Sequence, residues 1–224
     1  METALLDFLD QVPALGDCLL INGDLFDFWF AWRSVVPRSG VRVAGALASL
    51  RRRIPVVLTG GNHDRWGGSF WERDMGIQFH PNLLRFEAAG RHIEARHGDG
   101  LAEQHRGARL IHRLTRSRAL VSAFGLLHPD VGMALIRTLS PRLADSTRHE
   151  AVLDAAMSRQ ESWAATHLTA NPTVDLLVLG HTHRAQCAEL HPGRFWLNPG
   201  AWMSAGQYAV VTPSRIDLLH FPID

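Results

Sequence analysis

Two aspartates, Asp24 and Asp27, follow a run of apolar residues in the stretch LLINGDLFDFW, residues 19–29. Because neighbouring carboxylates repel each other, grouping them at the end of an apolar strand gives no gain in stability. A cation held between these carboxylates and other groups would account for the pair. The stretch therefore predicts a positive group beside Asp24 and Asp27.

Similar polar blocks follow three further apolar runs. They are GNHD at 61–64, HGD at 97–99 and GHTH at 180–183. In open α/β sheets, ligands collect beyond the carboxyl ends of the strands. Asp, Asn and His supply oxygen and nitrogen ligands suited to Mn, Fe or Zn. One such His is more often a hydrogen-bonded structural residue than a ligand, but four blocks together predict a shared metal centre.

Apolar periodicity predicts the elements that would position these blocks. The pattern indicates an α/β layered fold with a helical insert. The expected elements are helices over 4–12 and 41–53, buried strands over 17–22, 55–61 and 174–180, a hairpin over 83–99 that turns at Ala88 to Gly90, a long helical stretch over 101–168, and strands over 185–221.

Composition narrows the class of protein. The 224 residues are 46% hydrophobic and 20% charged, which is typical of a globular chain with one large core. A formal net charge of +1 gives no bulk attraction to nucleic acid, so none is expected as a partner. Cys18 and Cys187 lie in apolar runs and are predicted to be buried thiols in a reducing compartment.

The sequence also bears on location. The N-terminal METALLDFLD is acidic and unlike a secretory signal, and no apolar run reaches the ~18 residues of a membrane span. We therefore expect a cytoplasmic protein that can also sit peripherally on the inner face of the membrane. The oligomeric state is left open.

The blocks resemble those of the calcineurin-like metallophosphoesterase superfamily, whose pattern is D-x-H, G-D-x-x-D, G-N-H-D or E, an isolated His, and G-H-x-H. The resemblance implies a four-layer αββα sandwich that holds two divalent metal ions, with Mn favoured over Fe or Zn. Such ions polarise a phosphoryl oxygen and activate a water for in-line attack.

The resemblance also implies a role for each matching residue. Asp24 would bridge the two ions, and His183 would help to bind one of them. Asp27 and Asp64 would orient neighbouring groups, and His63 would stabilise or protonate the leaving oxygen. The implied ligands of the other ion are Asn62, His97 and His181.

The D-x-H block has no counterpart before Asp24. The ion at His183 would then keep only two protein ligands, fewer than the three or more that are usual for a firm site. We therefore expect this chain to hold about one metal firmly and to hydrolyse phosphodiesters poorly. We also expect the encoded upstream sequence to contain D-x-H, and an extended chain to bind two ions and to be far more active.

A branch of the superfamily is also similar in detail. GHTHRA, GAW and the closing RIDLLHFPID resemble the branch that hydrolyses UDP-2,3-diacylglucosamine in lipid A synthesis, as does a helical cap at 101–168 within a single domain over 1–224. The resemblance implies cleavage of the pyrophosphate of this nucleotide-linked lipid to UMP and an acyl sugar phosphate.

Two other functions stay open. Members of that branch often carry Arg where this chain has His63, so a phosphodiesterase or phosphatase acting on soluble nucleotides or phosphoproteins is one alternative. A non-catalytic binding module on the same fold is the other. The absent D-x-H favours the module, whereas the histidines preserved in the remaining blocks argue against it.

Two groups outside the blocks have both a structural and a functional interpretation. Four arginines recur at helical spacing within the insert, as a solvated basic face or as a contact for substrate phosphate or anionic lipid. Five aromatic residues just past the first block are expected mainly to pack. The arginines are Arg106, Arg109, Arg113 and Arg116, and the aromatic residues are Phe26, Phe28, Trp29, Phe30 and Trp32.

Overall fold

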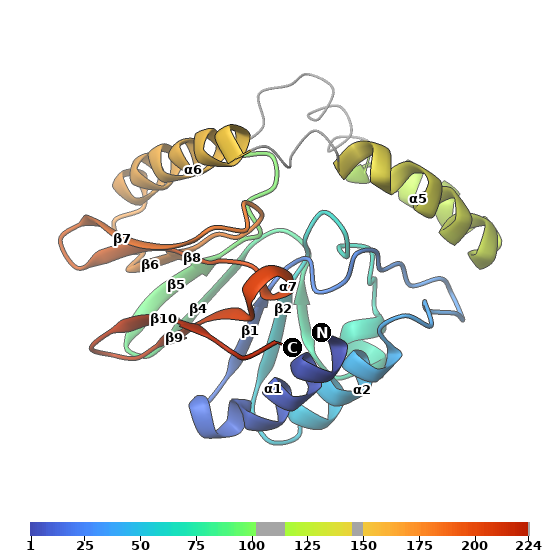
Figure 1. Cartoon of the computed structure of the whole chain (residues 1–224), viewed down its shortest axis with the longest axis horizontal. Helices are drawn as coiled ribbons and strands as arrows, with labels where there is room; N and C mark the ends of the chain where they lie inside the picture. The colour runs from blue at the N-terminus through green and yellow to red at the C-terminus, as the bar shows by residue number, and fades with distance from the viewer. Residues whose placement is uncertain (102–114, 145–149, 224) are drawn as a thin grey trace.

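The computed structural model describes residues 1–101, 115–144 and 150–223 of the chain. Two sheets lie face to face in the middle of the molecule, with helices on both outer sides (Figure 1). The fold is of the mixed α/β class, and the layers follow the αββα order expected from the sequence.

The first sheet carries the first two polar blocks. Its strands are all parallel, in the order β1-β2-β3, with Leu19 opposite Val56. A separate antiparallel hairpin of β9 and β10 belongs to the same side of the core. The bounds are β1 (Leu19–Asn22), β2 (Val56–Thr59), β3 (Gln78–His80), β9 (Gln207–Val211) and β10 (Ile216–His220).

The second sheet carries the other two blocks. It has five strands in the order β4-β5-β6-β8-β7, of which β5, β6 and β8 run parallel while β4 and β7 are antiparallel edges. The bounds are β4 (Leu84–Ala88), β5 (Arg91–Ala95), β6 (Leu176–Val178), β7 (Ala185–His191) and β8 (Arg194–Pro199).

Alternation of side chains along the strands produces the layers. In β2, Val56 and Leu58 face the helices, whereas Val57 packs in the core between the sheets. In β6, Leu176 lies between the sheets and Leu177 faces the opposite helix. Successive side chains of a strand point to opposite faces, so an apolar strand covered on both sides reads as a continuous apolar run.

Helices cover the outer face of each sheet. α1 (Glu2–Leu15) and α2 (Val41–Leu50) pack on the first sheet, and α6 (Glu150–Ala170) lies along β7 and β8 (Figure 1). The remaining helical elements are short or belong to the insert: η1 (Phe70–Asp74), α4 (Arg118–Gly125), α5 (Pro129–Ala144) and α7 (Trp202–Ala205). None of the described helices is long and apolar enough to cross a bilayer.

Several sequence predictions need correction. The helical stretch predicted over 101–168 contains, in its described part, the separate helices α4, α5 and α6, and α5 projects away from the sheets (Figure 1). The helix predicted over 41–53 ends earlier, because α2 stops at Leu50. The arginines at 51–53 therefore lie in turns after the helix. Cys18 precedes β1 and is exposed, and Cys187 is half-buried, so neither is the buried thiol predicted. The prediction of one domain over 1–224 with a cap at 101–168 stays a prediction.

Candidate metal centre

The four polar blocks meet where parallel strands end. β1 and β2 run in parallel and end before Asp24 and the GNHD block, and β5 and β6 do the same for the HGD and GHTH blocks. The loops approach so closely that a Cβ on Gly23 would lie 2.6 Å from His97 Nδ1. Gly23 also has φ 79, a conformation that glycine adopts without strain.

Three of the predicted ligands form a compact group. Ligand atoms of Asp24, His97 and His181 all lie within 4.8 Å of one another. The Asn62 side-chain oxygen joins them, because it lies 3.2 Å from His97 Nε2, which in turn is 2.9 Å from Asp24 Oδ2. One carboxylate, one amide oxygen and two imidazoles converge, as the sequence indicated.

His97 is oriented for metal binding by its other ring nitrogen. Nδ1 lies 2.9 Å from the Asn22 carbonyl, which can only accept, so Nδ1–H donates and Nε2 is left facing Asp24. A ligating histidine commonly donates its second N–H to a carbonyl or carboxylate in this way. The donor set of oxygens and imidazoles therefore fits a divalent transition metal.

Asp24 and His97 form a charged pair in the metal-free protein. Burial alone would raise the pKa of Asp24, but the charge and hydrogen bond of His97, with a smaller effect of His63, hold it well below its usual range. Burial alone would lower the pKa of His97, but the charge of Asp24 and its hydrogen bond raise it to about 9. The carboxylate is therefore ionised and keeps a positive partner.

Asp64 links the loop after β1 to the loop after β2 through its buried carboxylate. Its carboxylate is fully buried and accepts three backbone N–H groups, from Gly61 at 2.8 Å, Leu25 at 2.6 Å and Asp24 at 3.2 Å. Burial and the nearby charge of Asp24 raise its pKa, against the opposing effect of these hydrogen bonds. Asp64 therefore ties the backbones of both loops together, and its orienting role in a metal site stays a prediction.

His63 lies at the rim of the group. Its backbone N–H donates to Asp24 Oδ1 at 3.0 Å, and its ring Nδ1 lies 2.7 Å from the Asp27 carbonyl. Because a carbonyl only accepts, Nδ1–H is the donor and Nε2 is the ring atom left for a proton transfer. Asp27 therefore holds His63 through its main chain, and the Asp27 side chain is exposed.

His183 is less closely tied to the group. Its side chain is exposed, and it lies outside the compact set of three, although the charge of Asp24 acts on it.

Of the four non-glycine residues with positive φ in the described chain, three are Asp24, His181 and His183. Backbone strain of this kind clusters at functional sites, where the surroundings hold it in place.

A buried ion-pair network, which sequence patterns did not reveal, links the blocks to the insert. Asp99 Oδ2 accepts from Arg65 at 2.7 Å and from Arg116 at 2.8 Å, and Arg65 also donates to the Gly61 carbonyl at 3.0 Å. Arg116 is thus held by a carboxylate rather than standing free in a basic stripe. The other three predicted arginines, Arg106, Arg109 and Arg113, lie outside the described residues.

The aromatic segment, residues 26–32, packs against α4 of the insert. Trp29, Phe30 and Trp32 are buried, as expected for packing residues. Phe124 of α4 packs on them, with ring centroids 4.9 Å from Phe30 and 5.8 Å from Trp32. Phe28 meets the same ring edge to face, with the centroids 6.0 Å apart. The segment therefore places α4 beside the metal loops.

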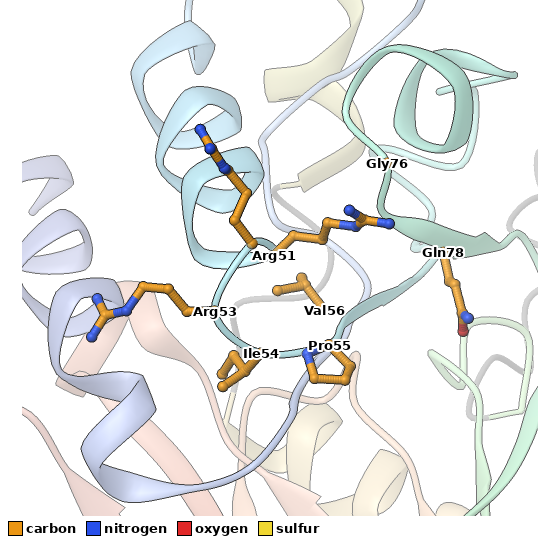
Figure 2. A pocket seen from close by; sticks show the side chains of 8 residues that line it. Arg51, Arg53, Ile54, Pro55, Val56, Gly76 and Gln78 are labelled. Atoms are coloured by element: carbon orange, nitrogen blue, oxygen red, sulfur yellow. The ribbon is translucent and has the colours of Figure 1, made fainter.

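A basic hollow of about 430 Å³ lies at the other end of the first sheet. It is lined by Arg51, Arg52 and Arg53 together with Gln78. Figure 2 shows Arg51 and Arg53 pointing away from each other, with Arg51 toward Gly76. Because these guanidinium groups do not point toward one another, they do not form a convergent group like that of Asp24, His97 and His181.

Comparisons with known proteins agree with this geometry. Residues 3–185 match the calcineurin-like phosphoesterase family. A UDP-2,3-diacylglucosamine hydrolase of Porphyromonas gingivalis is 26% identical over 227 residues, which cover 94% of this chain and 86% of that protein. A protein of the same name from Escherichia coli O157:H7 is 28% identical over 222 residues, 97% of this chain and 90% of that protein.

A solved structure shares the fold. An archaeal phosphodiesterase superimposes with a TM-score of 0.50 at 13% sequence identity, covering 98% of this chain and 92% of that one. The family match spans most of the sequence, and the blocks that define the family meet in space. This chain therefore belongs to the calcineurin-like phosphoesterase family and is a metallophosphoesterase.

Proposed function

We propose that this chain hydrolyses the pyrophosphate of UDP-2,3-diacylglucosamine, releasing UMP and an acyl sugar phosphate. The observation that carries the proposal is the convergence of Asp24, Asn62, His97 and His181 in a chain whose curated relatives are named for that reaction. The reaction belongs to lipid A synthesis, and the substrate is a nucleotide-linked lipid.

The proposed metal site consists of these four side chains. We expect Mn to be the preferred ion, with Fe or Zn as alternatives, and one ion to be held more firmly than the second. The second ion would have Asp24 and His183 as its ligands from the described residues. When bound, divalent cations polarise a phosphoryl oxygen and lower the pKa of a water molecule.

The chain's own residues then have separate tasks. Asp64 keeps Asp24 and the GNHD loop in register through its three backbone contacts. His63, with Nδ1–H committed to the Asp27 carbonyl, would deliver a proton from Nε2 to the leaving oxygen or stabilise its charge. Because His63 is already oriented, little ordering is required during the reaction.

Exposed apolar side chains on the insert support a lipid substrate. α4, α5 and the turn between them bear large apolar residues that are exposed, and α4 itself packs on the aromatic segment. Such a patch near a catalytic site is suited to acyl chains or to a membrane surface. These residues are Leu120, Leu126, Leu127, Val131 and Leu135.

We further propose that the protein acts peripherally on the cytoplasmic face of the membrane, where such a lipid would be presented. Arg106, Arg109 and Arg113 would add contacts to anionic headgroups or to substrate phosphate. Binding to anionic vesicles should then weaken in the triple Gln variant and fade as salt rises. Binding that ignores both changes would remove the arginines from the proposal.

A two-substrate assay tests the proposal. UMP release from UDP-2,3-diacylglucosamine in detergent micelles is compared with hydrolysis of bis-p-nitrophenyl phosphate, both with Mn²⁺. Leu126→Ser with Val131→Ser should slow the lipid reaction at least tenfold and leave the aryl reaction within twofold. Leu219→Ser, which changes an exposed leucine on β10, is the matched control and should affect neither reaction.

One alternative is kept because of His63, which stands where the lipid-hydrolysing branch often has Arg. It is a phosphodiesterase or phosphatase that acts on soluble nucleotides or phosphoproteins. Faster turnover of nucleotides than of the lipid would favour that alternative. So would a lipid reaction whose rate does not change in the Leu126→Ser, Val131→Ser variant, and both results would contradict the proposed substrate.

A further inference from the structure

The turn that carries His181 is strained. The Thr182 N–H donates to the Gly180 carbonyl at 2.9 Å and so closes a three-residue turn around His181, whose φ is 72. Three-residue turns with positive φ at the centre are rare and strained. Such a conformation persists only where surrounding groups over-determine it. Groups outside the turn must therefore hold it.

Gln160 of α6 is one such group. Its side chain is 0% exposed, and Nε2 donates to the Gly180 carbonyl at 2.8 Å. The N–H of the same residue, Gly180, donates to the His97 carbonyl at 2.8 Å. A Cβ on Gly98 would come within 2.9 Å of Gln160 Nε2. The amide therefore lies between the two loops that carry His97 and His181.

A second buried amide completes the network. Asn198 of β8 is also 0% exposed, donates to Thr182 Oγ1 at 2.8 Å, and accepts the Gly200 N–H at 3.0 Å. Its amide nitrogen lies 3.4 Å from Gln160 Oε1, so the two amides are linked. Buried polar networks whose members are satisfied rigidify the structure around them.

We propose that Gln160 is a positioning residue of the metal centre, holding the Gly180–Thr182 turn so that His181 and His97 face the same ion. The inference rests on the metal site proposed above. Gln160 does not contact the ion, and its effect passes through the Gly180 carbonyl. If Gln160 only filled space in the core beneath α6, its substitution would lower stability without changing the affinity for metal.

Gln160→Met separates these two roles. Met keeps the length of the side chain and removes the donor to Gly180. Leu168→Ala is the matched control, because Leu168 is on the same helix, is 0% exposed, and packs in the apolar cluster under β6. The probe is Co²⁺, titrated into chelator-treated protein well below either melting temperature and followed by visible absorption.

We expect Gln160→Met to raise the Kd for Co²⁺ at least tenfold and to change the shape of the cobalt absorption bands. Leu168→Ala should lower the melting temperature at least as much while keeping the Kd within twofold and the bands unchanged. Wild-type affinity and bands in Gln160→Met, or equal metal loss in the control, would overturn the proposal.

Two further variants keep the test decisive. If Gln160→Met does not fold, Thr182→Val removes the hydroxyl that accepts from Asn198, and it should alter the cobalt bands, whereas wild-type bands would overturn the proposal. His181→Ala separates the two levels of inference. Unchanged Co²⁺ binding in His181→Ala would refute the metal site itself, whereas metal loss there with wild-type binding in Gln160→Met would refute only the role of Gln160.

Discussion

Binding of a divalent cation should release about one proton near neutral pH. In the metal-free protein the burial of His97 on its own would lower its pKa, but the charge and hydrogen bond of Asp24 raise it to about 9. A histidine must be neutral to bind a metal. At pH 7, about two units below that pKa, nearly every His97 carries a proton that the cation has to displace.

The size of the effect follows from this gap. Apparent metal affinity should rise about tenfold per pH unit between pH 7 and 8.5 and level off above about 9. The gap of about two units between pH 7 and the pKa of His97 means that removing this proton costs roughly 2.7 kcal/mol of metal-binding free energy at pH 7. An ordinary histidine, with a pKa of about 6.5, is already mostly neutral in this window, so the slope would belong to His97.

Titration calorimetry measures the proton count directly. Mn²⁺ is added to metal-free protein at pH 7 in buffers of different ionisation enthalpy, and the dependence of the observed heat on the buffer gives the protons released. His92→Ala, at the opposite end of β5 and exposed, is the control and should release the same number. No proton release at pH 7, or an affinity that is flat from pH 7 to 8.5, would refute the reasoning.

Further predictions concern stability and roles. The metal-free protein should lose roughly 2 kcal/mol of stability as the pH rises from 7 to 9, because the raised pKa of His97 contributes stability that is complete below about 6.5 and is lost as the pH rises through about 9; denaturant unfolding at both pH values checks this. His63→Ala should lower kcat by roughly 10² or more with bound Mn²⁺ nearly unchanged, and equal metal loss would make His63 a ligand. Asp64→Ala should lower the free energy of unfolding by roughly 3 kcal/mol, since three backbone N–H groups lose their acceptor, and a loss below about 1 would contradict that. Arg65→Met should cost roughly 3–5 kcal/mol in urea unfolding, and Arg116→Met about 1, because Arg65 is 6% exposed and Arg116 41%; equal losses would contradict this difference.

The grouping of the polar blocks could be predicted because their positions depend on local rules. Each polar block directly follows an apolar run, and parallel strands bring their carboxyl ends to one edge of a sheet. β1 beside β2, and β5 beside β6, place Asp24, Asn62, His97 and His181 together as expected. The apolar runs of β2 and β6 indicate strands covered on both faces, whereas the four-layer order was implied by the resemblance to the family.

Contacts between distant segments could not be predicted in the same way. Gln160 meets Gly180 across 20 residues, and Arg116 meets Asp99 across 17, with nothing in their local patterns to mark either pair. The exposure of Cys18 was missed because the apolar run was taken to begin before the strand, which starts at Leu19. Helical periodicity also does not fix where an insert breaks into separate helices.

Metal content tests the central claim most directly. Wild type, Asn62→Ala, His181→Ala and His63→Ala are dialysed against Mn²⁺ and analysed for bound metal, with circular dichroism to confirm folding. We predict that about one ion stays firmly bound in wild type and in His63→Ala, and that it is lost in Asn62→Ala and His181→Ala. Full metal in folded Asn62→Ala and His181→Ala would contradict the site at the carboxyl ends of the strands.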